Sequence, residues 1–293
     1  MDQKDRVYAL TIGDYKSGLG VRIEELQIKF EVTKSSDNKR RPAGATVEVY
    51  NLSPSTLHLL DSNFIQCTLE VGYKLIGKQT ILQGNVVEIK TVQHGNDKVT
   101  QLLLGEGYVE LNNQIVKKVI PAGSTKEAVL EAIRDSMPGV SRGAYTGFNL
   151  NSPILYGYPL NGTPKELLDT FAESNNMEWR VNNGSLYAND INGLVSKSKS
   201  LAPLISKETG LIDIPFRTTE KGKKLPGDKT RKKGVQFKAL LNPNIVPGQI
   251  VYLKSEDIKG WFRVNDIRYT GDYRGNDWYI ECFCSLIDDE ELL

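Results

Sequence analysis

Few side chains in this sequence are of the kinds that bind metals or act as nucleophiles. The 293 residues include three cysteines and two histidines, namely Cys67, Cys282, Cys284, His58 and His94. Structural zinc sites usually pair their ligands with about two to four residues between them, and no such pair occurs here. A Cys-x-Cys site completed by the third cysteine and the histidines is the weaker alternative. We expect no metal and no cofactor, and we expect the cysteines to serve as small apolar core residues.

Motifs for catalysis are also missing from the sequence. A Ser-His-Asp or Cys-His arrangement needs a histidine, yet His58 falls in a predicted helical turn and His94 just before a loop. Neither lies near a G-x-S-x-G nucleophile motif, and the sequence has no P-loop or G-x-G-x-x-G. The 36 acidic residues offer too many accidental pairs to assign a glycosidase. We predict that the protein is not an enzyme.

The strongest local charge lies in a basic loop. Residues 217–233 contain eight basic and two acidic residues. Such a loop can attract phosphate by charge, but it lacks the interleaved aromatic residues that stack on bases. We favour a solvated loop that becomes ordered against a partner. The candidate partner-contact residues are Lys221, Lys223, Lys224, Lys229, Arg231, Lys232 and Lys233.

The whole-chain composition excludes several protein classes. A net charge of +1 creates no general attraction to nucleic acid or membranes. No run approaches the length of about 18 apolar residues that a membrane helix needs, and the first residues lack the apolar core of a secretion signal. Three cysteines argue against a disulfide framework. We expect a soluble protein made in a reducing cytoplasm, with no membrane insertion.

The first hundred residues read as β-strands. Alternation places Leu26, Ile28, Phe30 and Val32 on one face of a strand. Val47 and Val49 share a face of the next strand. A short helical turn follows, with Ser53 as its cap and Pro54 as its first residue. Three further strands are expected between residues 67 and 104.

The middle of the chain, residues 105–195, reads as a small α+β domain. Two helices with reciprocal capping are expected there, and a hairpin should turn at Asn183-Gly184. The predicted capping residues are Ser124 with Glu127, and Thr163 with Glu166, where Pro164 is the first helical residue.

The C-terminal third returns to strands and repeats features of the first third. One strand is expected over residues 210–220, and four more follow the basic loop. The tripeptide Gly-Asn-Asp occurs at 95–97 and again at 275–277. In both regions an Asn and Pro turn, a strand, a loop and a second strand precede it.

Finer features also match between the two regions. Val86 and Ile89 fall on opposite faces of their strand, as Val264 and Ile267 do, and a β-bulge at the same point would explain both patterns. Cys282 and Cys284 align with Leu102 and Leu104. We infer that one β-rich unit occurs twice.

The C-terminal region resembles the baseplate hub proteins of contractile-tailed bacteriophages. It carries a "LLNP…PG" turn, a "G-[FY]-R-V" strand at 260–264 and a "GD-x-RG-x-[DE]-W" hairpin ending at Trp278. The N-terminal "VEVYNLSPSTLHLL" is also similar to that family. The resemblance covers about half of the chain, and none of these motifs is catalytic.

The resemblance implies a fold and a role. It implies a β-dominated α+β protein with two similar tube-type β-barrel domains, at 1–104 and 196–293, and the α+β domain of residues 105–195 between them. Such hubs are homotrimers, so three chains present six similar barrels in a pseudo-sixfold ring, which joins a sixfold tail tube to a threefold central spike. A symmetric interface uses one patch on every subunit, so one chain must present two equivalent patches to make six from three.

The implied partners follow from that role. They are the tail tube protein, the central spike protein and baseplate wedge proteins, with tape-measure protein and DNA passing through the lumen. The implied location is the virion tail baseplate, with the host cytoplasm during assembly. A permanent interface should exceed about 2,000 Å², and the barrel edges should be covered by partner strands or loops.

Three alternatives remain open at this stage. One is the equivalent component of a tailocin or a type VI-like secretion device. A second is a tail-associated cell-wall hydrolase, although the only segment outside the repeat, residues 105–195, contains no histidine. A third is a carbohydrate-binding module.

Overall fold

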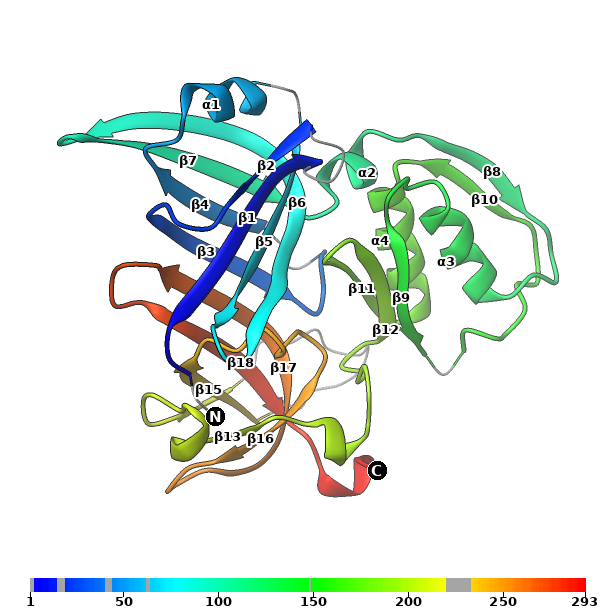
Figure 1. Ribbon diagram of the computed structural model, residues 1–293. Coiled ribbons are helices and arrows are strands. Elements are labelled where there is room, and N and C mark those ends of the chain that lie inside the picture. The colour runs from blue at the N-terminus through cyan, green and yellow to red at the C-terminus, as the bar shows by residue number, and fades with distance from the viewer. Residues whose placement is uncertain (1–2, 15–18, 40–43, 62–63, 148, 220–232) are drawn as a thin grey trace.

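The computed structural model combines a large β-rich body with a smaller α+β part beside it (Figure 1). It describes residues 3–14, 19–39, 44–61, 64–147, 149–219 and 233–293. The α+β part stands to one side of the β-rich body, and both ends of the chain lie at the lower end of that body. The predicted fold class, α+β with β-structure dominant, is confirmed.

Strands from both ends of the chain build the β-rich body. The N-terminal strands are β1 (Arg6–Asp14), β2 (Leu19–Ile23), β3 (Ile28–Ser35), β4 (Gly44–Tyr50), β5 (Gln66–Tyr73), β6 (Gly77–His94) and β7 (Asp97–Gly105), with helix α1 (Pro54–Leu60). The C-terminal strands are β13 (Leu204–Ser206), β14 (Phe216–Thr219), β15 (Lys233–Leu240), β16 (Ile250–Lys254), β17 (Lys259–Asp272) and β18 (Trp278–Leu286).

These strands form one sheet of 13 strands. Its main path runs β14-β15-β18-β17-β3-β4-β7-β6-β5-β1-β2, and β16 adds to β17 and β13 to β16. The antiparallel pairing of β3 with β17 joins the N-terminal half of the sheet to the C-terminal half. A single apolar core continues through both halves.

Alternation of apolar and polar residues explains why these segments form strands. Along β3 the side chains of Ile28, Phe30 and Val32 are buried, as are those of Val47 and Val49 along β4. Such alternation places one face of a strand on the core and the other toward water. Helix α1 begins as predicted, since the Ser53 hydroxyl accepts the Thr56 N–H and Pro54 is the first helical residue.

The α+β part occupies the middle of the chain. It contains helices α2 (Tyr108–Asn112), α3 (Lys126–Arg134) and α4 (Pro164–Asn175), and strands β8 (Val116–Ile120), β9 (Ser141–Thr146), β10 (Tyr158–Gly162), β11 (Met177–Asn182) and β12 (Ser185–Asp190). The predicted capping box of Thr163 and Glu166 is present. The hairpin turns at Asn183-Gly184, where both φ angles are positive, as predicted.

Two local predictions were wrong. Thr125, not Ser124, caps α3, because its hydroxyl accepts the Ala128 N–H and its backbone bridges to Pro153. The strand expected over 210–220 is only β14, which starts after Pro215. Proline lacks an N–H, so it interrupts a ladder and sets the start of that strand.

A glycine on β17 makes a close contact that admits no side chain. Gly271 pairs with Phe30 of β3, and a Cβ placed there would lie 2.2 Å from the Phe30 ring. That ring cannot move freely, because it packs edge to face on Trp278 at 5.4 Å between centroids. The close approach fixes how β3 lies on β17.

We expect Gly271→Ala to lower the free energy of unfolding by about 1–3 kcal/mol, because the added methyl overpacks this junction. Chemical denaturation measures the effect. Gly157→Ala is the matched control, since the nearest atom to a Cβ there is 3.5 Å away, and we expect it to change stability by less than about 0.5 kcal/mol. Equal effects of the two variants would contradict the contact.

Candidate assembly interface

Four strands of the N-terminal half correspond, by their pairing, to four strands of the C-terminal half, and we call these two sets of strands the two copies. Val86 and Ile89 of β6 pair with Leu104 and Leu102 of β7, just as Val264 and Ile267 of β17 pair with Cys284 and Cys282 of β18. Strand β6 therefore corresponds to β17, and β7 to β18. The predicted alignment of the two cysteines with the two leucines is confirmed.

A β-bulge lies at the same point of both copies. The β6–β7 register shifts between Val86 and Glu88, and the β17–β18 register shifts between Val264 and Asp266. A bulge inserts one extra residue and reverses the faces that follow it. This confirms the bulge predicted from side-chain parity.

Two further strands of each half correspond through these pairs. Ala45 of β4 lies opposite Leu104, and Val235 of β15 lies opposite Cys284, so β4 corresponds to β15. Val32 of β3 lies opposite Ala45, and Arg217 of β14 lies opposite Val235. Strand β3 therefore corresponds to β14.

The two copies differ in how their edges are used. The outer edge of β17, from Asp266 to Asp272, is covered by β3. The corresponding segment of β6, from Glu88 to His94, pairs with β7 on one side only, and β14 pairs only with β15. Within the described residues, no strand covers either edge. We call the pairing of β3 with β17 the internal junction. Each chain also carries the two edges that an equivalent junction would join, namely those of β14 and β6.

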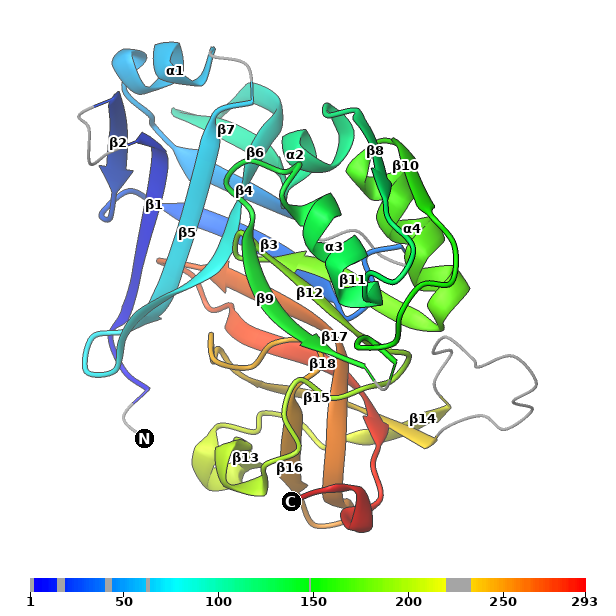
Figure 2. The same cartoon turned by 90° about the vertical axis from the view of Figure 1, so that its right-hand side faces the viewer.

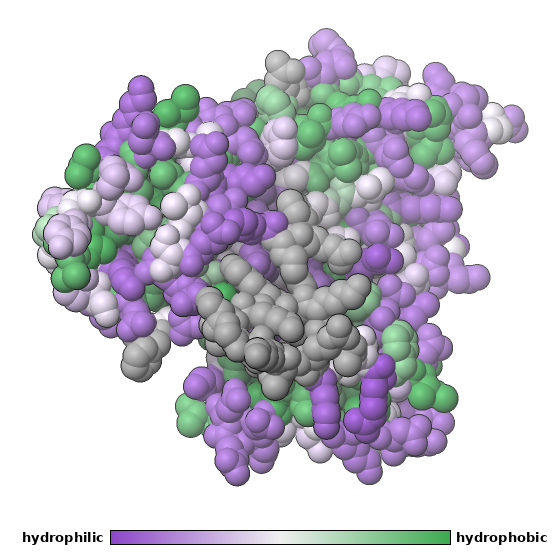
Figure 3. Space-filling view, turned by 180° about the vertical axis from the view of Figure 1, so that it is seen from behind, coloured by the Kyte–Doolittle hydropathy of each residue, from purple (hydrophilic) through white to green (hydrophobic). Residues whose placement is uncertain are grey.

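A groove lies beside the open edge of β6. A cavity of about 540 Å³ is lined by Leu57, Leu60 and Asp61 of the α1 region, by Ile89, Thr91, Val92 and Gln93 of β6, and by Lys98 of β7. Ile89 is 38% exposed, whereas its counterpart Ile267 is 1% exposed under β3. Seen from behind, apolar surface also appears on the upper part of the β-rich body, the part that holds α1, β6 and β7 (Figure 3).

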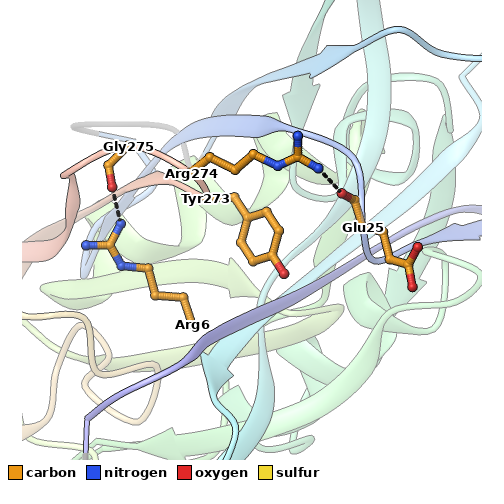
Figure 4. A pocket seen from close by; sticks show the side chains of 5 residues that line it. All are labelled: Arg6, Glu25, Tyr273, Arg274 and Gly275. Atoms are coloured by element: carbon orange, nitrogen blue, oxygen red, sulfur yellow. Dashed lines mark hydrogen bonds between the residues drawn. The ribbon is translucent and has the colours of Figure 1, made fainter.

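Hydrogen bonds join the second Gly-Asn-Asp hairpin to the N-terminal half of the sheet (Figure 4). Arg6 donates to the carbonyl oxygens of Asp272, Gly275 and Asn276 at 3.0, 2.6 and 2.9 Å. Arg274 donates to the Glu25 carbonyl at 3.0 Å. Both arginines border an open cavity of about 610 Å³, but their guanidinium groups already serve backbone carbonyls. The arrangement holds the two halves together rather than forming an anion site.

A buried ion pair ties the α+β part to the C-terminal half. Glu178 of β11 contacts the guanidinium of Arg263 of β17, and both side chains are at most 3% exposed. Arg263 also donates to the Gly193 carbonyl at 2.9 Å, and Asn189 donates to Glu178 at 2.8 Å. Burial raises the pKa of Glu178, while Arg263 and Arg180 oppose that rise.

A second buried ion pair ties the α+β part to the N-terminal half. Lys34 of β3 lies 2.9 Å from Glu106, and neither side chain is more than 2% exposed. Lys34 also donates to Asn183 in the β11–β12 turn at 2.7 Å. Burial lowers the pKa of Lys34, although Glu106 opposes that shift.

The sequence analysis did not identify these charged residues. A signal for Lys34 exists, because it continues the alternation of Ile28, Phe30 and Val32 toward the buried face. Arg263 lies within the "G-[FY]-R-V" motif, whose arginine is here the link between the C-terminal half of the sheet and β11.

The residues first considered for chemistry are now placed. All three cysteines are buried thiols, and burial raises the pKa of Cys67 to about 12, so its thiol is not poised as a nucleophile. The His58 side chain is 90% exposed and next to Asp61, and His94 is exposed at the end of β6. Among the residues that the structure describes, no three His, Cys, Asp or Glu side chains form a potential metal site.

Most of the predicted partner-contact loop lies outside the described residues. This applies to Lys221, Lys223, Lys224, Lys229, Arg231 and Lys232. Lys233 is exposed at the start of β15 and pairs with Thr219 of β14. Over the described part of the chain, no helix is long and apolar enough to span a bilayer.

Comparison by sequence finds no relative. No protein-family model matches the chain, and a search of curated proteins returns no match.

Comparison by structure finds clear neighbours. The 43 kDa tail protein of prophage MuSo2 from Shewanella oneidensis has a TM-score of 0.66 at 8% identity, with 99% of this chain and 100% of that chain covered. A tail protein from Neisseria meningitidis has a TM-score of 0.64 at 10% identity, covering 96% and 97%. The E. coli c3393 protein, a component of the type VI secretion system with structural similarity to T4 tail proteins gp27 and gp5, has a TM-score of 0.62 at 10% identity, covering 91% and 75%.

These TM-scores, over nearly all of this chain, establish a shared fold, and identities of 8–10% limit the conclusion to the fold. The resemblance predicted from the C-terminal motifs is confirmed at that level: the chain has the fold of phage tail proteins and of a related type VI secretion component.

Proposed function

We propose that this protein is a structural hub of a phage tail baseplate, and that it works as a homotrimer whose duplicated β-units form a pseudo-sixfold ring. The observation that carries the proposal is the internal junction between the two units. Strand β3 covers β17 within one chain, while the corresponding edges of β14 and β6 have no described strand partner. Because the edges of β14 and β6 match the two sides of the internal junction, further copies of the chain can repeat that junction.

Ring closure follows from the equivalence of the junctions. A head-to-tail interface closes into a ring only if its rotation divides a full turn. If the junction between chains repeats the rotation of the junction within a chain, three chains present six similar units. Such a ring would match a sixfold tail tube on one side and a threefold spike on the other.

The α+β part and the basic loop are the further partner surfaces of this hub. Two buried ion pairs fix the α+β part against the sheet. A ring of three chains would therefore carry three α+β parts in equivalent positions, which gives it threefold and not sixfold symmetry. Its exposed apolar residues include Leu155 and Tyr156, which are 80% and 82% exposed. The basic loop connects β14 to β15 and so starts at an open edge, which supports its predicted role in contacting a partner.

Electron microscopy of the purified protein tests this function. We expect ring-shaped particles whose top views show six similar lobes and threefold symmetry, because each chain supplies two units and one α+β part. Particles without rotational symmetry, or with a symmetry other than threefold, would contradict the proposed hub.

In this proposal the protein acts by forming interfaces between subunits and not by catalysing a reaction. A peptidoglycan-clearing assay with the purified chain separates this role from that of a cell-wall hydrolase. We expect no clearing, and clearing by the chain at catalytic amounts would refute a purely structural role.

A further inference from the structure

We propose that β14 of one copy adds to the open edge of β6 in the next copy, in the register in which β3 lies on β17. This inference rests on the proposed function, because the occupant of the edge is a second copy of this chain. It specifies which residues meet at the junction between subunits. Figure 2 shows β14 at the lower end of the sheet and β6 with β7 at the other end.

The register follows from strand pairs within the chain. Tyr269 of β17 lies opposite Val32 of β3. The counterpart of Tyr269 is Thr91, because these residues pair with the corresponding residues Ile280 and Thr100. The counterpart of Val32 is Arg217. Thr91 of one copy should therefore lie opposite Arg217 of the next, and Val92 opposite Phe216.

The backbone of β6 presents hydrogen-bonding groups at this edge. Neighbouring residues of a strand point their N–H and C=O groups to opposite sides. The Lys98 carbonyl accepts from Asn51 on the β4 side, so Val99 points toward β6. Val92 pairs with Val99 and therefore points toward β7, which leaves the N–H and C=O of Thr91 directed at the open edge.

The backbone of β14 is arranged in the matching way. The Lys238 carbonyl accepts from Ile212 on the β14 side of β15, so Gln236 points to that side too. Phe216 pairs with Gln236 and points toward β15, so Arg217 directs its N–H and C=O outward. Thr91 and Arg217 can then exchange two hydrogen bonds, as a hydrogen-bonded pair of antiparallel strands does.

The side chains at the proposed junction complement each other. Val92 is 43% exposed and Phe216 is 56% exposed, and the register makes them direct cross-strand neighbours. An aromatic and a β-branched residue form a favourable cross-strand pair. The register also places Arg217 beside the groove, whose lining includes one acidic residue, Asp61, and one basic residue, Lys98. The pairing therefore covers two exposed apolar side chains.

A disulfide between these positions tests the register. Val92 and Phe216 would form a non-hydrogen-bonded pair, with Cα atoms about 4.5 Å apart, which lies within the range that a disulfide spans. Within one chain the two strands are seven sheet positions apart, about 34 Å at the usual strand spacing, so a bond between them must join two chains. The native cysteines are buried and should not compete.

The experiment is mild oxidation of the variant that carries both Val92→Cys and Phe216→Cys, followed by non-reducing electrophoresis. We expect a covalent trimer that reduction returns to monomer. Each single-cysteine variant should stay uncrosslinked. The variant with Thr91→Cys and Phe216→Cys should form at least tenfold less crosslinked product, because its two thiols lie on opposite faces of the sheet.

Light scattering on the unmodified protein separates the possible failures. A trimer in solution whose double-cysteine variant does not crosslink would overturn the proposed pairing and leave the trimeric function standing. A monomer without crosslinking would overturn both. Equal crosslinking by the Thr91 and Val92 variants would overturn the register.

Discussion

Replacing Glu178 by leucine is expected to lower the free energy of unfolding by about 3–5 kcal/mol, because it leaves the Arg263 guanidinium buried without its charged partner. The variant removes the acid that contacts Arg263 and also accepts from Asn189. Because Arg263 lies on β17 and Glu178 on β11, the loss should loosen the α+β part from the sheet. Chemical denaturation gives the change in stability, and hydrogen exchange shows where protection is lost.

Two companion variants make this prediction specific. Glu173→Ala breaks an exposed ion pair with Lys39, in which the Glu173 side chain is 60% exposed and the Lys39 side chain 39% exposed. We expect it to lower the free energy of unfolding by less than about 1 kcal/mol. Combining Glu178→Leu with Arg263→Met should recover part of the stability lost in the single variant, because the Arg263 charge is then removed with its partner, while only the buried Arg180 still loses the attraction of Glu178. If Glu178→Leu costs no more than Glu173→Ala, the ion pair does not hold the α+β part in place.

Replacing Thr91 by proline is expected to abolish the trimer while leaving each chain folded. The change removes the N–H that points to the open edge, and edge positions of this kind tolerate proline. The loss of one backbone hydrogen bond leaves an unpaired partner, at a cost of about 1–3 kcal/mol per junction, or about 3–9 kcal/mol over three junctions. Light scattering reports the mass, and circular dichroism reports whether the strands remain.

Thr91→Val is the matched control for the proline variant. It keeps the backbone N–H and loses only the hydroxyl contact with Thr100, at 3.1 Å. We expect this variant to remain a trimer. A folded Thr91→Pro protein that stays trimeric would show that β6 does not form the contact between subunits.

Local features were predicted from the sequence where short-range rules decide the structure. The alternation in β3 and β4, the capping box at Thr163 and the turn at Asn183-Gly184 all depend on residues close together in the chain. The shared bulge was also predictable, because Val86 with Ile89 and Val264 with Ile267 break alternation in the same way. The cap of α3 was misplaced by one residue because a bridge from Thr125 to Pro153 sets the start of that helix.

The interface was less predictable because strand pairing is not local. The repeat of a β-unit was predicted from the sequence, but alternation identifies only the buried face of a strand and not its neighbour. That β3 covers β17 while β6 stays open depends on contacts more than 200 residues apart. The same limit explains the missed ion pair of Lys34, which lies on β3, and Glu106, which lies in the turn after β7.

The molar mass of the purified protein in solution, measured by size-exclusion chromatography with light scattering, tests the central claim most directly. The chain mass is 32.7 kDa, and the account predicts a species of three chains that persists on dilution. A mass of one chain at every concentration, or a stable assembly of two or four, would contradict a ring built by repeating the internal junction.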